Sequence, residues 1–352
     1  MSTPSKPAVS SDRPEKLARI TEVLDRRGAS GVRLTSGASL AWLLDGARTS
    51  VPLGGPAVFS AVVRIDGTIT VTALRNEAER LAEEELAGVD IEVVDWFAPL
   101  APSRAGVLDE SEVDVELRAA RASLLPAELD RYRNLGADAA RAMTEVLTTA
   151  TPELTEFELA GRLTHALLAR GAEPAVALVA GAARGGVQHP LPTRAPLGDR
   201  AMAVATARRD GLHVSLTRWV RFRGVEPDGA ARILEVEADA WAACRPGRPL
   251  GDVLSDIARS YPRHGFAEDA WLRHHQGGPT GYAGRDPKAS PDAQDRIAPG
   301  QAFAWNPWAP GVKTEDTVVR GQGDAVEVLS VDQEWPTVDV RGVARPVALD
   351  LT

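Results

Sequence analysis

The chain has 352 residues, 44% hydrophobic and 25% charged, which is enough for about two globular domains and excludes a disordered or fibrous protein. Its 49 acidic and 40 basic side chains give a net charge of −9 without a basic segment, which argues against nucleic-acid binding. The single cysteine, Cys244, excludes an intrachain disulfide and a multi-cysteine metal cluster. No apolar stretch approaches the ~20 residues that cross a bilayer. Residues 1–16 lack the apolar segment of a secretion signal, so we expect a cytoplasmic protein without membrane contact.

The first part of the chain has the pattern of a small mixed α/β domain. Residues 1–12 are rich in serine and proline and are predicted to be disordered. Asp12 is then expected to cap a helix that has an early proline, Pro14, and ends at Gly28. Short apolar runs alternate with turns, and a second helix is expected later; the runs are 32–34, 41–44, 58–65 and 68–74, and the helix is 77–86. We therefore predict one α/β domain over residues 13–125.

A second pattern of helices and strands begins near residue 128. A long helix is expected first, and Thr155 and Glu158 form a capping box for a second helix, which ends at Gly171. The later segments alternate between strand and helix patterns: strands at 175–180, 201–207 and 212–222, helices at 228–243 and 250–260, and strands at 301–306, 316–320 and 325–331. This pattern predicts a second α/β domain over residues 126–352.

Histidine is the natural starting point for the search for a site, because imidazole titrates near neutrality. Among the six histidines, His189 lies in a glycine-containing loop that directly follows a predicted strand. Catalytic groups concentrate in loops that a scaffold positions, so we expect His189 to be functional and not merely bonded to backbone. His165 lies in the middle of a predicted helix and is expected to be a structural or surface residue.

Two further segments carry dense polar residues. Alternation along the strand at 212–222 puts His213, Ser215 and Thr217 on one face, which is either a pocket wall or a solvent-exposed surface. Residues 274–286 contain His274, His275, Gln276 and Arg285 among four glycines, which predicts backbone held close to a ligand more than an ordinary surface turn.

The last candidate segment contains Trp305, Asn306 and Trp308 and continues to Glu315. The tryptophans either wall a cavity or fill the core, and Glu315 is either a site residue or a paired structural carboxylate. The glycine-rich phosphate-binding motifs of nucleotide enzymes are absent from the sequence, so a nucleotide substrate or cofactor is not expected.

Taken in order, these segments resemble the creatinase, aminopeptidase P and methionine aminopeptidase family. The resemblance is carried by order and spacing over nearly the whole chain; its segments are 41–48, 129–133, 155–160, 180–190, 210–218 and 315–317. It implies a creatinase-like N-terminal domain at 13–125 and a pita-bread catalytic domain at 126–352. It also implies a homodimer and a small-molecule or short-peptide substrate.

Members of this family hold two divalent cations with two aspartates, one histidine and two glutamates. In this sequence the second aspartate position falls on Ser215 and the first falls on or beside Val204. The histidine position falls on Gly278, the first glutamate falls on Asn306, and only Glu315 remains. One carboxylate cannot neutralise two divalent cations in a partly dry pocket, so we expect neither a bound metal nor another cofactor.

The resemblance therefore implies a metal-independent enzyme of the Xaa-Pro aminopeptidase and creatinase group. Creatinase cleaves a C–N bond without metal and uses the histidine that aligns with His189. We expect acid–base chemistry of a hydrolase-like kind, with His189 and Glu315 as catalytic residues. Seven residues are expected to bind the substrate: His213, Ser215, His274, His275, Gln276, Arg285 and Asn306.

Two alternatives remain open from the sequence. One is a non-catalytic pseudo-peptidase that binds a peptide or a partner protein, as related domains in chromatin chaperones do. The other is an Xaa-Pro metallo-aminopeptidase whose metal ligands lie at positions other than those aligned above.

Overall fold

The computed structural model describes residues 9–101, 105–321 and 325–352, which form two compact units. The first unit comprises Met1–Arg131 with Asp210–Leu212, and the second comprises Tyr132–Arg209 with His213–Thr352. Of the segment that the sequence predicts to be disordered, residues 1–8 lie outside the described part of the chain. None of the described helices has the length and hydropathy that a bilayer span requires.

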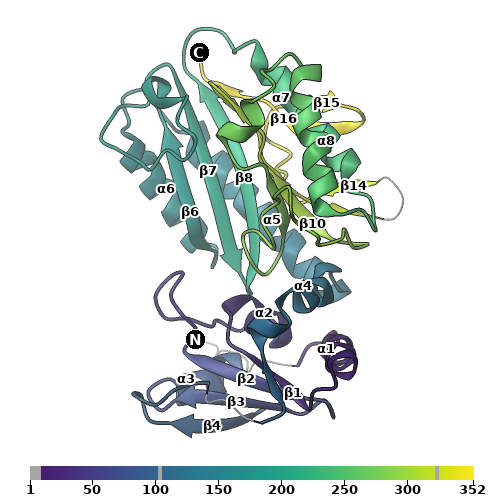
Figure 1. The fold of residues 1–352 in the computed structure, drawn as a ribbon. Coiled ribbons are helices and arrows are strands. Elements are labelled where there is room, and N and C mark those ends of the chain that lie inside the picture. The colour runs from purple at the N-terminus through teal and green to yellow at the C-terminus, as the bar shows by residue number, and fades with distance from the viewer. Residues whose placement is uncertain (1–8, 102–104, 322–324) are drawn as a thin grey trace. The chain divides into compact units, whose positions relative to one another are not determined.

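The first unit is built on a five-stranded mixed sheet in the order β4-β3-β2-β1-β5. Strands β1, β2 and β3 pair antiparallel, and β4 and β5 join them in parallel (Figure 1). Helix α1 contacts α2, α4 and β2, and fully buried side chains such as Leu24 and Trp42 fill the core. The elements are α1 (Arg13–Arg27), β1 (Gly31–Leu34), α2 (Gly37–Leu43), β2 (Phe59–Arg64), β3 (Ile69–Leu74), α3 (Ala78–Arg80) with a following π-helical turn (Leu81–Glu85), β4 (Asp90–Val94), β5 (Val107–Asp109), a 3₁₀ turn (Glu110–Glu112) and α4 (Asp114–Ala122).

Two local features of this unit differ from the sequence pattern. The apolar run at 41–44 lies mostly in helix α2, because the Ser36 hydroxyl accepts a hydrogen bond from the backbone amide of Ser39 and starts a helix there. Asp12 precedes helix α1, but its side chain makes no cap bond to that helix. It accepts instead from the backbone amide of Glu128, in the first turn of α5.

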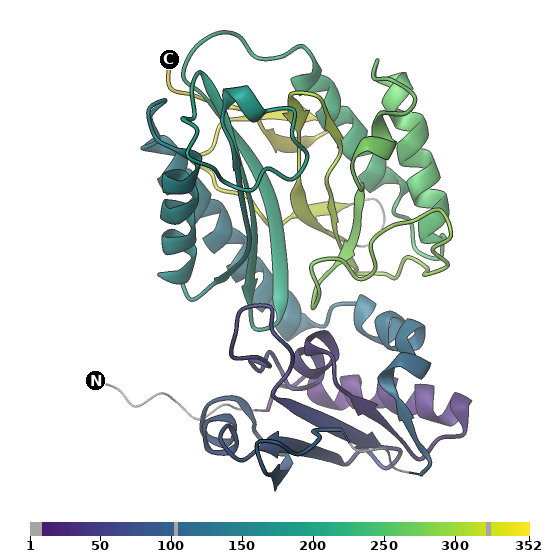
Figure 2. The same ribbon diagram turned by 60° about the vertical axis from the view of Figure 1, so that its left-hand side comes forward.

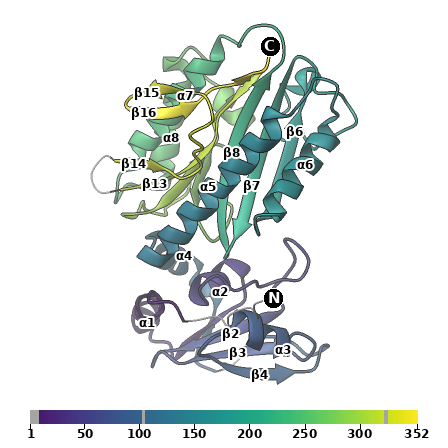
Figure 3. The ribbon, with the colours of Figure 1, turned by 180° about the vertical axis from the view of Figure 1, so that it is seen from behind.

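The second unit contains two four-stranded sheets, in the orders β17-β8-β7-β6 and β14-β13-β10-β9. Helices α5 and α6 lie across strands β6–β8 of the first sheet (Figure 3). Helix α7 contacts β10 of the second sheet and the short strand β11. Its elements are α5 (Pro126–Thr148), which begins in the first unit, α6 (Glu156–Leu168), β6 (Glu173–Ala180), a 3₁₀ turn (Ala182–Arg184), β7 (Arg200–Arg209), β8 (Leu212–Arg221), α7 (Gly229–Ala243), α8 (Leu250–Arg263), a 3₁₀ turn (Ala270–Arg273), β9 (Gly277–Thr280), β10 (Ala302–Trp305), β11 (Trp308–Ala309), β12 (Val312–Lys313), β13 (Asp316–Arg320), β14 (Val326–Val328), β15 (Thr337–Val340), β16 (Val343–Pro346) and β17 (Leu349–Asp350).

The two sheets of this unit meet where β8 lies beside the start of β13. The backbone amide of Thr217 donates to the carbonyl of Glu315 at 2.9 Å, and the amide of Ser215 donates to Thr317 Oγ1 at 2.8 Å. Figure 2 shows the teal strands of the first sheet next to the yellow-green strands of the second, with the green helices α7 and α8 outside them. This junction sets residues of β8 against residues that are about 100 positions later in the chain.

Strands β7 and β8 form a hairpin whose tight turn is Asp210-Gly211. Both residues have a positive φ, 52° and 75°, as the turns that match the twist of a hairpin require. The polar face that alternation predicts on β8 is not a solvent surface, because Ser215 is fully buried and Thr217 is 3% exposed. The solvent-surface alternative is therefore wrong for these two residues, and Thr217 also lines a cavity of the second unit.

Candidate functional site

Glu315 lies at the junction of the two sheets, between β12 and β13, and is 2% exposed. Lys313 Nζ donates to Glu315 Oε2 at 2.8 Å, and Arg285 Nη2 donates to Oε1 at 2.6 Å. Thr217 Oγ1 also lies 3.3 Å from Oε2 and accepts from Lys313 at 3.0 Å. Both carboxylate oxygens are therefore bonded to cationic side chains of the protein itself.

These partners determine the charge of the carboxylate. Burial alone would raise the pKa of Glu315, but Lys313 and Arg285 outweigh it through charge and hydrogen bonding and lower the pKa to about 2. Glu315 is thus an anion throughout the neutral range and a very weak base. The residue is well suited to hold Arg285 and Lys313 in place and poorly suited to exchange protons.

The positions that align with the family's other metal ligands do not supply a hard-cation site. Val204 belongs to an apolar cluster, and Ser215 shares a hydrogen bond of 3.0 Å with Thr206. Gly278 has no side chain, and its φ of 141° together with the nearby Pro287 carbonyl leaves no room for one. Two divalent cations need several anionic oxygens, so the residues present do not fit the metal pair of the family.

Asn306, the remaining aligned position, is 3% exposed and contributes a neutral amide. Its Oδ1 has no hydrogen-bond partner among the described residues, and its backbone amide donates to the carbonyl of Gln276 at 3.0 Å. An amide oxygen without a charge is a weak substitute for a glutamate as a ligand of a hard cation.

Three histidines form a second cluster in the same unit. His189 comes from the loop between β6 and β7, whereas His274 and His275 connect a 3₁₀ turn to β9. The ring centroid of His189 lies 4.8 Å from that of His274 and 5.3 Å from that of His275, and the latter two are 4.5 Å apart. His274 is buried, His275 is half-buried and His189 is exposed. The cluster therefore reaches from the interior to the surface.

The surroundings keep all three imidazoles in the neutral form at neutral pH. Burial, followed by Lys313, lowers the pKa of His274 to about 3, and burial with Arg285 lowers the pKa of His275 to about 4. Partial desolvation, Lys313 and Lys288 also lower the pKa of His189, against the opposing effect of Glu315. Neutral imidazoles can accept a proton or a metal ion through a ring nitrogen.

The remaining predicted residues have internal partners. Gln276 accepts from the Tyr261 hydroxyl at 2.8 Å, and its amide nitrogen donates to the carbonyls of Trp271 and His274. One ring nitrogen of His213 lies 3.2 Å from the carbonyl of Gly281. These contacts show Gln276 and His213 holding the 274–286 segment against the rest of the unit.

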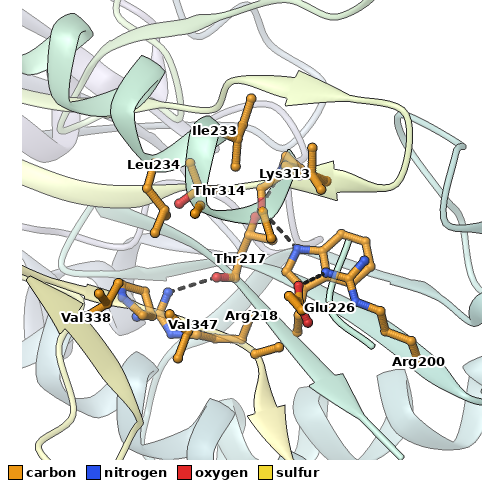
Figure 4. A pocket seen from close by; sticks show the side chains of 16 residues that line it. Arg200, Thr217, Arg218, Glu226, Ile233, Leu234, Lys313, Thr314, Val338 and Val347 are labelled. Carbon is orange, nitrogen blue, oxygen red and sulfur yellow. Dashed lines mark hydrogen bonds and ion pairs between the residues drawn. The ribbon is translucent and has the colours of Figure 1, made fainter. Parts of the chain in front are cut away.

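A cavity of about 210 Å³ adjoins the Glu315 pairing on the side of β12 and α7 (Figure 4). Its lining is mostly apolar and includes Leu234 and Val347, while Thr217 and Lys313 supply a polar wall. The Arg200 guanidinium stacks 3.7 Å from the ring centre of Trp219 at the same cavity. The cavity can therefore accept an apolar group next to charged side chains.

The structure thus brings together two sets of the predicted residues: His189, His274 and His275 in one, and Ser215, Arg285 and Glu315 in the other, where Arg285 lies 3.4 Å from Ser215 Oγ. The sequence analysis missed Lys313, although it stands two residues before Glu315. In extended chain such residues share a face, so this spacing was a usable signal.

Comparisons with known proteins agree with this architecture. The model of metallopeptidase family M24 matches residues 130–322, more than half of the chain. The comparison with curated protein sequences gives no match.

Solved structures with the same fold span almost the full length of the chain. The dipeptidase PepE from Mycobacterium ulcerans is 20% identical, with a TM-score of 0.73 over 96% of this chain and 98% of that one. The prolidase from Pyrococcus horikoshii is 17% identical, with a TM-score of 0.72 over 91% and 99%. The N-terminal domain of a FACT complex subunit from Cicer arietinum (chickpea) is 11% identical, with a TM-score of 0.63 over 91% and 95%.

At these identities the likeness to solved structures establishes the fold alone, and the family follows from the match of the family model. The predicted fold class, a creatinase-like N-terminal domain followed by a pita-bread domain, is confirmed. The chain belongs to metallopeptidase family M24.

Proposed function

We propose that the protein is a hydrolase-like acid–base catalyst that acts on a C–N bond of a small polar molecule or short peptide without the metal pair usual in its family. One observation carries this proposal: both oxygens of Glu315 are bonded to Lys313 and Arg285. This supports the proposal, because positively charged side chains occupy the one carboxylate that the resemblance aligns with a family metal ligand. The membership in a peptidase family supports the reaction class.

His189 is the residue best suited to transfer the proton. Its side chain is exposed and can meet a substrate, and its lowered pKa leaves the ring neutral and able to accept a proton at pH 7. Burial lowers the pKa of its neighbours His274 and His275 to about 3 and about 4, so these two imidazoles are weak bases near pH 7.

Arg285 is the residue best suited to bind a negatively charged group. It is anchored to Glu315, while its Nε is buried and has no hydrogen-bond partner among the described residues. A guanidinium held in this way can pair with a substrate carboxylate or stabilise negative charge that develops on a carbonyl oxygen. Ser215 and Glu315 would position Arg285, and the adjoining cavity would receive an apolar substituent.

A second candidate function is the binding of a peptide or partner protein without turnover. Its support is that the Glu315 carboxylate, with a pKa of about 2, is fully occupied by internal partners and cannot act as a base near pH 7. The other alternative, an Xaa-Pro metallo-aminopeptidase with displaced ligands, would need an oxygen-rich site for the two cations of the family. Among the described residues, the one group of three side chains that could ligate a metal is His189, His274 and His275, which includes no aspartate or glutamate.

The test is turnover of small amides, amidines and Xaa-Pro peptides by protein kept in a chelator. We expect His189→Ala to lower the rate by about 10²–10⁴-fold, the usual contribution of a general acid or base. His165→Ala, an exposed histidine on α6, should leave the rate unchanged. Equal rates in wild type and His189→Ala would refute the catalytic role of His189. Binding of a peptide without cleavage would favour the second candidate.

A further inference from the structure

We propose that His189, His274 and His275 form a binding site for one divalent cation of the zinc type, distinct from the metal pair of the family. One ring nitrogen from each of the three side chains lies within 4.8 Å of the other two. None of these residues stands at a position that aligns with a family metal ligand, because those positions carry Val204, Ser215, Gly278, Asn306 and Glu315.

The unpaired nitrogens of the cluster are the second observation. His274 is 5% exposed, and neither of its ring nitrogens has a hydrogen-bond partner among the described residues. Nδ1 of His275 is also buried without such a partner. Buried polar atoms of this kind are rare in native proteins, because each one loses its hydration without replacement. A cation shared by the three rings would satisfy one nitrogen of each.

The donor set decides which cation fits. Three imidazole nitrogens without a carboxylate suit zinc, copper, nickel or cobalt, whereas calcium and magnesium require oxygen ligands. Three protein ligands also leave the fourth position of a tetrahedral site for water or another ligand.

The rings need only a small adjustment to share an ion. Nitrogens around a tetrahedral zinc ion are about 3.3 Å apart when each bond is about 2.05 Å long. Side-chain rotations that move each ring nitrogen by roughly 1 Å would therefore close the site. The nearby cations do not prevent this. Lys313 and Arg285 are both paired with Glu315, and Lys288 is exposed and screened by solvent.

An ion in this site would regulate the reaction proposed above. Coordination takes the lone pair of His189, which then cannot accept a proton from the substrate or water. Inhibition by zinc therefore rests on the proposed function, whereas zinc binding does not. The two can fail separately, because binding is measured without substrate and turnover is measured in a chelator.

The experiment is a calorimetric titration of the full-length, chelator-stripped protein with zinc at neutral pH, together with cobalt titration followed by its visible absorption. We expect one ion per chain. His274→Ala and His275→Ala should each weaken zinc binding by more than about 100-fold. Removing a residue that only supports a metal ligand typically costs about 10–100-fold in affinity, and removing the ligand itself costs more. His165→Ala, the matched control on α6, should bind as wild type does.

His189→Ala keeps the test decisive if the buried variants fail to fold, because His189 is exposed. It should weaken binding to the same extent as the other two variants. Absence of zinc binding by the wild type, or equal affinity in wild type and His189→Ala, would overturn the proposal. Binding of two ions that persists in His189→Ala would also overturn it, because it would place the metal away from the histidine cluster.

Discussion

At the scale of single residues, Glu315 illustrates how its neighbours determine what a carboxylate can do. The same side chain surrounded by other acids would ligate a cation. Here it lies between Lys313 and Arg285, and its pKa falls to about 2 in spite of burial. The three charges now depend on one another, because a buried ion that loses its partner keeps the full cost of leaving water.

Glu315→Gln should therefore destabilise the protein strongly. The substitution leaves Lys313 and Arg285 buried with uncompensated charge, which typically costs about 3–5 kcal/mol of the free energy of unfolding. Glu327→Gln is the matched control, because its partner Arg133 is half-exposed and such surface pairs contribute less than about 1 kcal/mol. Urea denaturation measures both. An equal decrease in the free energy of unfolding of the two variants would show that the Glu315 pairing contributes no more than a surface ion pair.

The sequence predicted part of this residue-level picture and missed the rest. It indicated that Ser215, Gly278 and Asn306 replace metal ligands, because spacing alone aligns them with the family. It missed Lys313 as the cation on Glu315, because a lysine in an extended segment usually points to solvent, and only the two-residue spacing pointed to a shared face. The lowered pKa values of His274 and His275 also depend on burial by distant segments, which no local pattern reveals.

At the scale of secondary structure, Asp239 joins helix α7 to its neighbours. Its carboxylate accepts from Ser260 at 2.6 Å and from Arg263 at 3.0 Å, both on α8, and from Arg341 at 2.7 Å between β15 and β16. Burial would raise the pKa of Asp239, but hydrogen bonds from Ser260, Arg341 and His264 outweigh it and lower the pKa to about 2. The ionised form is thus the one that holds these elements together.

This pairing should make stability depend on pH in the acid range. The folded pKa of Asp239 is about 2 and its ordinary value is 3.8. The carboxylate therefore contributes stability that is present above about pH 4 and is lost as the pH falls toward 2. Asp239→Asn should unfold more easily at pH 7 and lose part of the acid dependence. Asp228→Asn, whose side chain is 93% exposed, should behave like wild type. The measurement is the free energy of unfolding of the three proteins as a function of pH between about 2 and 7. The same acid dependence in all three would contradict this prediction.

Patterns along the chain predicted most elements of the second unit, because they are set by local signals. The Thr155 capping box starts α6 as expected, and the Asp210-Gly211 turn joins two alternating strands. Asp12 was predicted to cap α1, yet its carboxylate accepts a hydrogen bond from the backbone amide of Glu128. A cap residue can be recognised from sequence, but its partner depends on which helix end the fold brings near.

At the scale of the whole molecule, the resemblance in segment order predicted the family and the fold class, which the family model confirms. The assembly of the site needed the structure. The histidine cluster joins residues about 85 positions apart, and the Glu315 pairing joins β8, the loop after β9 and the start of β13. The pairing of the strands decides which of these segments face each other. The order and register of that pairing could not be read from the single sequence.

Thermal unfolding of the whole protein should distinguish the two possible metal sites. A ligand that binds only the folded state at 100 times its Kd stabilises it by about 2.7 kcal/mol. For a unit of about 200 residues this raises the Tm by on the order of 5–10 °C. We expect such a shift with zinc and none with magnesium or calcium, because the cluster offers nitrogen and no carboxylate oxygen.

The zinc shift should vanish in a variant that combines His189→Ala and His274→Ala and persist in His165→Ala. A shift with magnesium equal to that with zinc would instead indicate oxygen ligands of the family's kind. That result would contradict both the proposed metal-independent reaction and the three-histidine site, because neither provides the oxygen ligands that magnesium requires.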